Sequence, residues 1–104
     1  MIRLFIIVFG LLTLGNTQEL DHLFEQFERG EINEVKKKIP ILLKKYPNDP
    51  GVKYLFGLTL VDGDSAIEVY KEIINKYPSS KYSEGASSKI GQYLYSRGLY
   101  TQAS

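Results

Sequence analysis

The chain has 104 residues, with 13 Lys and Arg against 12 Asp and Glu, and it contains no cysteine. A net charge of +1 excludes a polyanion binder driven by bulk charge, because such domains are strongly basic. The lack of cysteine excludes a disulfide scaffold, thiolate metal sites and a cysteine nucleophile. This length has room for a single domain.

The first eighteen residues have the layout of a secretory signal peptide. Arg3 gives the positive charge, the apolar run Leu4–Leu14 follows it, and small and polar residues come next. An eleven-residue helix spans about 16 Å, which is short for a hydrocarbon core of about 30 Å. We therefore predict a signal peptide at 1–18, cleaved after Thr17 or Gln18. The alternative is a core helix or an uncleaved anchor, which would be the only membrane contact of the chain.

The remaining chain shows the 3.6-residue period of amphipathic helices, and no sustained alternation predicts a strand. We expect the apolar stripes of five helices at 20–27, 32–43, 52–60, 66–74 and 86–94. The expected breaks between them are Gly30, Tyr46-Pro47, Asp62-Gly63-Asp64 and Tyr77-Pro78, and Arg97-Gly98 is expected to close the fifth helix before a sixth begins at Tyr100. Asp64 or Ser65 is expected to cap the fourth helix, and Pro40 to kink the second.

Several short motifs recur at a spacing that indicates structural repeats. Tyr46-Pro47 returns as Tyr77-Pro78 after 31 residues, and Phe56-Gly57 returns as Ile90-Gly91 after 34. A period near 34 residues with two helices in each unit is typical of a helical-repeat solenoid.

These motifs resemble the tetratricopeptide repeat. The third unit matches its pattern at Ile90-Gly91, Leu94, Gly98, Tyr100 and Ala103, and the second at Phe56-Gly57, Leu60, Ala66, Tyr70, Ile73 and Pro78. The resemblance implies an all-α fold in which antiparallel helix pairs stack as a short right-handed solenoid. About two and a half repeats would cover 19–104, with units at 19–49, 50–80 and an incomplete 81–104.

Two sets of residues take expected roles from the repeat. The residues at the packing positions of the repeat would lie where the helices cross. They are Gly57, Ala66, Tyr70, Pro78, Gly91, Gly98 and Ala103. The resemblance also implies a peptide-binding groove along the first helix of each pair, formed by Tyr54, Leu58, Val61, Ser88, Gln92 and Tyr95. The alternative for Tyr54 and Tyr95 is that they are partly buried supports for neighbouring helices.

The segment from Ala66 to Ser80 is similar to envelope members of the family, such as the outer-membrane β-barrel assembly lipoprotein and the periplasmic partner of the Tol-Pal system. Without a cysteine this chain cannot be a lipoprotein. We therefore expect an exported, periplasmic or envelope-associated adaptor that binds a protein or peptide segment. The alternative is a spacer or oligomerisation arm for a missing C-terminal domain, for example one that binds peptidoglycan.

No sequence motif indicates catalysis, a cofactor, a metal or a nucleic-acid partner, so we expect no enzyme activity. His22 is the only histidine, and one histidine without cysteine does not make a typical zinc site. Asp62-Gly63-Asp64 lacks the spaced acidic positions of a calcium loop. A run of lysines from Lys36 to Lys45 follows an acidic first helix; it could contact anionic lipid or peptidoglycan, or pair with the acidic helix beside it.

Overall fold

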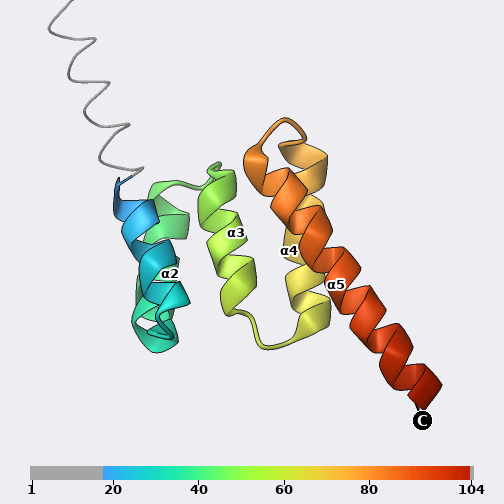
Figure 1. Cartoon of the computed structure of the whole chain (residues 1–104). Helices are drawn as coiled ribbons and strands as arrows, with labels where there is room; N and C mark the ends of the chain where they lie inside the picture. Colours follow the sequence, from blue (N-terminus) through green and yellow to red (C-terminus); the bar gives the residue numbers. More distant parts are fainter. Residues whose placement is uncertain (1–17, 104) are drawn as a thin grey trace, which may run out of the picture. The chain divides into compact units, whose positions relative to one another are not determined.

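The computed structural model describes the backbone of residues 18–103 and the side chains of 18–98, so the predicted signal peptide up to residue 17 lies outside the described part. A helix over 18–28 is followed by α2 (Ile32–Lys45), α3 (Pro50–Thr59), α4 (Gly63–Lys76) and α5 (Lys81–Ala103), as Figure 1 shows. No strand occurs between residues 18 and 103, which confirms the all-α prediction. The chain divides into two compact units, residues 1–35 and 36–104, and each is described by itself.

The described part of the first unit is a helix followed by the start of α2. Its apolar side chains Leu20, Leu23 and Val35 are buried. The helix ends where predicted, at Gly30, whose φ of +85° lies in the left-handed region that favours glycine.

In the second unit, the predicted ends of α2 and α4 and the start of α3 follow from local chemistry. The tyrosine of each Tyr-Pro pair, at residues 46 and 77, closes a helix by donating its N–H to the carbonyl four residues earlier, at 2.8 Å in both cases. Asp49 caps α3: its carboxylate accepts the Gly51 N–H at 2.8 Å, and Pro50 occupies the first helical position.

The start of α4 differs from the prediction, because Asp62 caps it instead of Asp64 or Ser65. Asp62 has extended backbone angles, and its carboxylate accepts the Asp64 N–H at 3.3 Å and the Ser65 hydroxyl at 2.6 Å. Gly63 therefore begins the helix where a break was expected. A carboxylate cap satisfies donors that the helix would otherwise leave unpaired, and this outweighs the low helix propensity of one glycine.

The core of the second unit lies between α3, α4 and α5, which run antiparallel to their neighbours (Figure 1). Helix α4 packs against both others, and α3 also contacts α5. The buried cluster consists of Ala66, Tyr70 and Ile73 from α4 and Ala86 from α5. Val52 and Leu55 of α3 are also fully buried.

Helix α5 continues through Gly98 to Ala103, so the predicted break and the separate sixth helix are wrong. A glycine within a helix lowers the stability of the helix by only about 1 kcal/mol relative to alanine, and no proline between residues 99 and 104 ends the helix. At 1.5 Å per residue α5 is about 34 Å long and α4 about 21 Å. Figure 1 shows α5 running on beyond the end of α4.

Candidate functional site

The predicted groove residue Tyr54 is part of the packing between α3, α4 and α5. Its ring lies 5.9 Å from that of Tyr70 and 5.6 Å from that of Tyr82. Its hydroxyl is so close to α5 that a Cβ on Gly85 would lie 3.1 Å from it. Burial raises the pKa of Tyr54, and it raises that of Tyr70 to about 12. The position of Tyr54 thus agrees with the alternative prediction, a support between helices.

The other predicted groove residues lie on α3, in the loop after it and on α5. Leu58 is half-buried on α3, whereas Val61 lies beyond the end of α3 and is 91% exposed. Val61 therefore belongs to a loop, because α3 ends at Thr59 and its helical face stops there. The remaining three residues are exposed on α5 at i, i+4 and i+7 and form a polar stripe of Ser88, Gln92 and Tyr95.

Of the predicted packing residues, Gly57 has the closest contact. A Cβ at this position would lie 2.6 Å from Cε1 of Tyr70, so α3 and α4 approach each other here as only glycine allows. Ala66 is buried in the same cluster, and Pro78 follows the end of α4. By contrast, a Cβ built on Gly91 or Gly98 meets no atom of another helix within 4 Å in the part of the chain that the structure describes, so their expected packing role stays a prediction. The side chain of Ala103 lies outside the described part.

A groove that the sequence did not predict lies between α4 and α5. Its volume is about 270 Å³. We call it the α4/α5 groove, and its walls are formed by Asp64, Ile67, Glu68 and Lys71 of α4 and by Ile90, Tyr93, Leu94 and Arg97 of α5. Apolar side chains therefore share the groove with two carboxylates and two cations.

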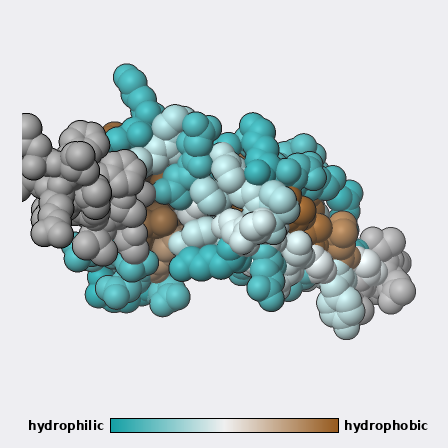
Figure 2. Space-filling view, turned by 90° about the horizontal axis from the view of Figure 1, so that it is seen from above, coloured by the Kyte–Doolittle hydropathy of each residue, from teal (hydrophilic) through white to brown (hydrophobic). Residues whose placement is uncertain are grey.

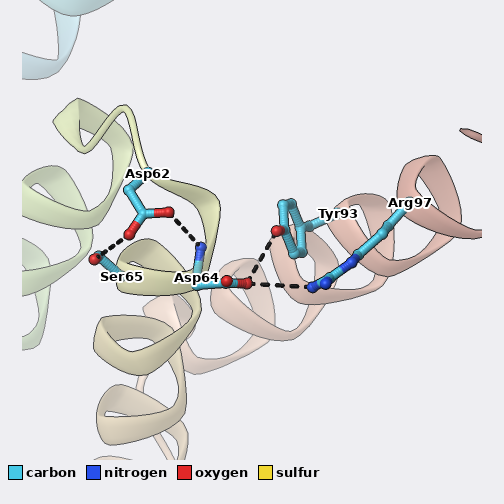
Figure 3. Close-up of polar contacts among 5 residues, drawn as sticks. All are labelled: Asp62, Asp64, Ser65, Tyr93 and Arg97. Carbon is cyan, nitrogen blue, oxygen red and sulfur yellow. Dashed lines mark hydrogen bonds and ion pairs between the residues drawn. The ribbon is translucent and has the colours of Figure 1, made fainter.

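One end of the groove is held together by contacts to the first turn of α4 (Figure 3). The Tyr93 ring lies so close to Gly63 that a Cβ there would overlap it. Its hydroxyl donates to Asp64 Oδ1 at 3.0 Å, and Arg97 Nη1 lies 3.4 Å from the same oxygen. This hydrogen bond to the Asp64 carboxylate raises the pKa of Tyr93. Because Asp64 and Arg97 are 70% and 63% exposed, their ion pair adds little stability and a ligand can compete for it.

The apolar side of the groove continues a stripe that begins in the core. Ser83, Ala86, Ile90 and Leu94 follow one another along a single face of α5. Ser83 and Ala86 are buried, Ile90 is half-buried and Leu94 is 55% exposed. Exposure therefore rises along this face from Ala86 to Leu94. The face of the molecule that Figure 2 shows is mainly hydrophilic, and Leu94 is one of the exposed large apolar side chains of the described residues.

The helical spacing of these four residues can be seen in the sequence. However, a helix face that is wholly buried in a core has the same spacing. Only the position of α4 decides which part of the stripe is covered. Asp64 of the groove pairs with Tyr93 and Arg97, and among residues 18–103 no three His, Cys, Asp or Glu are placed to hold a metal ion. The arrangement is suited to binding an apolar side-chain row with charged groups beside it.

A charged cluster one turn further along α4 links this helix to α3. Lys53 Nζ lies 2.6 Å from Glu72 Oε1, and Lys76 Nζ lies 3.0 Å from the same oxygen. The hydrogen bond from Lys53, then that from Lys76, lowers the pKa of Glu72 below its ordinary value of 4.5. A carboxylate with a lowered pKa in the folded state stabilises the fold above its unfolded-state pKa and loses this effect as the pH falls through the folded-state value.

We therefore expect acid to weaken the fold partly through Glu72. The free energy of unfolding should fall as the pH drops below 4.5, and Glu72→Gln should reduce this pH dependence. Urea denaturation at a series of pH values measures it. Glu68→Gln, one turn earlier on α4, is the matched control. An unchanged pH profile in Glu72→Gln would show that the cluster does not contribute.

Comparison with protein-family models, with curated proteins and with solved structures finds no significant match. Within the described residues, no helix combines the length and the apolar character needed to cross a bilayer.

Proposed function

We propose that the chain is a non-enzymatic adaptor of the tetratricopeptide type, which binds an amphipathic helix of a partner protein in the α4/α5 groove. The observation that carries this proposal is the exposure of Leu94 at the end of a stripe whose earlier residues are buried or half-buried. A partner that covers an exposed apolar side chain removes its surface from water. Each Å² of apolar surface removed in this way favours binding by about 25 cal/mol.

A helix is the occupant that best fits the walls of this groove. Two neighbouring helices leave a furrow between them, and a third helix fits into it at an axis separation of about 8–10 Å. Ile67 and Ile90 form the apolar centre, and Glu68 and Lys71 offer charges of both signs to its flanks. The partner would therefore present apolar residues at i, i+3, i+4 and i+7, with charged residues beside them.

The proposal also includes export to a bacterial envelope. The pattern at 1–18 supports export, and the resemblance of the segment from Ala66 to Ser80 to envelope repeats supports the compartment. The α4/α5 groove replaces the groove of first helices as the binding surface, since Tyr54 is engaged in packing and Val61 lies in a loop.

The prediction that tests this function uses two adjacent exposed residues on different faces of α5. Leu94 lies in the groove, and Tyr95, 70% exposed, lies on the polar stripe. A photo-crosslinking amino acid at position 94 of the full chain, expressed in its own cells, should form a covalent adduct with a partner protein. The same amino acid at position 95 should not. Mass spectrometry identifies the adduct.

A charge in the groove should have a correspondingly local effect on affinity. Leu94→Glu should weaken the affinity for the partner identified by crosslinking at least tenfold. Tyr95→Glu should change this affinity less than threefold. Adducts at 88, 92 and 95 without one at 94 would assign binding to the polar stripe instead. An adduct between two copies of the chain would favour an oligomerisation arm.

A further inference from the structure

A second surface, formed by α2, carries a high local charge. Five lysines lie between residues 36 and 45, and no Asp or Glu occurs from 35 to 48. All five lysines are exposed. The segment thus carries a charge of +5, although the whole chain has a net charge of only +1.

An exposed aliphatic residue stands at the centre of these lysines. Ile41 is 67% exposed, while Ile39 and Leu42 are the buried residues of this part of the helix. The four nearest positions on the surface of a helix are i−4, i−3, i+3 and i+4. For Ile41 all four are lysines, namely Lys37, Lys38, Lys44 and Lys45. We call this set of five residues the lysine face.

We propose that the lysine face binds the surface of an anionic lipid bilayer. The aliphatic side chain of Ile41 would enter the boundary between headgroups and acyl chains, and the ammonium groups around it would contact lipid phosphates. Each lysine near such a surface contributes an attraction that falls off within a Debye length of about 8 Å. Only charges close to the lipid matter at that range, so the near-neutral total charge does not oppose binding.

The position of Ile41 favours lipid over a soluble polyanion. An acidic peptide or a nucleic acid would pair with the lysines, but neither needs an exposed aliphatic residue at the centre of them. A bilayer offers both anionic groups and an apolar layer within a few ångströms of each other. This inference does not depend on the α4/α5 groove.

The absence of cysteine permits a local test in the full chain. Ile41→Cys carries an environment-sensitive fluorophore at a single site, and Val61→Cys, 91% exposed in a loop, carries the same label as the control. The vesicles are phosphatidylcholine alone, or phosphatidylcholine with about one-third phosphatidylglycerol. The label at 41 should shift to the blue only with the anionic vesicles, and the label at 61 should not shift. This readout is separate from any lipid contact of residues 1–17.

Affinity for the anionic vesicles should depend on the lysine face in a specific way. Lys38→Gln with Lys45→Gln should weaken binding about 30-fold, and Ile41→Ser about tenfold. Lys81→Gln with Lys89→Gln removes the same charge from α5 and should change affinity less than twofold. Circular dichroism checks that each variant remains folded.

Three results would overturn the proposal. One is a label at position 41 that does not respond to anionic vesicles. Another is an equal loss of affinity in the control pair on α5, which would indicate general charge attraction. The third is binding to soluble polyglutamate as tight as to vesicles and unchanged by Ile41→Ser, which would assign the face to an acidic macromolecule.

Discussion

Ile73→Ala should lower the free energy of unfolding by about 3 kcal/mol, within the range of about 2–5 kcal/mol found for such truncations. Ile73 is fully buried, and it belongs to the cluster in which α4 packs against α3 and α5. Its truncation removes apolar contacts and leaves a cavity that the surrounding helices can fill only in part. Domains of this size are stabilised by about 5–15 kcal/mol, so the loss is a large share of the total.

Urea denaturation followed by circular dichroism measures this effect. Ile41→Ala is the matched control: the same side chain is truncated at a position that is 67% exposed, and we expect a change of less than about 0.5 kcal/mol. Similar losses in the two variants would show that the packing of α4 is not as described.

Gly57→Val should lower the free energy of unfolding by about 2–3 kcal/mol. A Cβ at this position would lie 2.6 Å from Tyr70, so the ring must move or α3 must shift. Tyr70 is 6% exposed, and Tyr54 packs beside it, so the ring has little room to move. The gain in helix propensity from replacing glycine offsets only part of the cost, at most about 1 kcal/mol.

Gly91→Val is the control for this substitution, because among the described residues no atom of another helix lies within 4 Å of a Cβ built at residue 91. We expect a change within about 0.5 kcal/mol. Denaturation of the double variant Gly57→Val with Tyr70→Ala tests the mechanism, since its loss should be smaller than the sum of the two single losses. Additive losses would indicate that Gly57 and Tyr70 do not contact each other.

The sequence predicted helix ends well where one local signal decides them. Gly30 adopts a backbone angle that other residues avoid, and the tyrosine before each of Pro47 and Pro78 closes a helix. Such signals act within a few residues, so they can be identified without knowledge of the tertiary structure.

Predictions failed where two local preferences compete. Glycine disfavours a helix at residues 63 and 98, yet both lie within one, because the cost is small and the Asp62 cap favours helix start in the first case. The solenoid arrangement and its repeat units remain predictions. The α4/α5 groove could not be predicted from periodicity, since Ala86 and Leu94 occupy the same face of α5 and differ only in what covers them.

The difference in length between α4 and α5 has a consequence for motion. The first half of α5 is fixed by side chains in the core, whereas the contact to α4 that the structure describes beyond Leu94 is the exposed ion pair of Arg97 with Asp64. Helical turns with few tertiary contacts open at low free-energy cost, so the turn from Leu94 to Gly98 should exchange between ordered and frayed states more readily than the first half of α5. A helix seated in the groove would suppress that fraying, and part of its binding energy would be used to order the turn from Leu94 to Gly98.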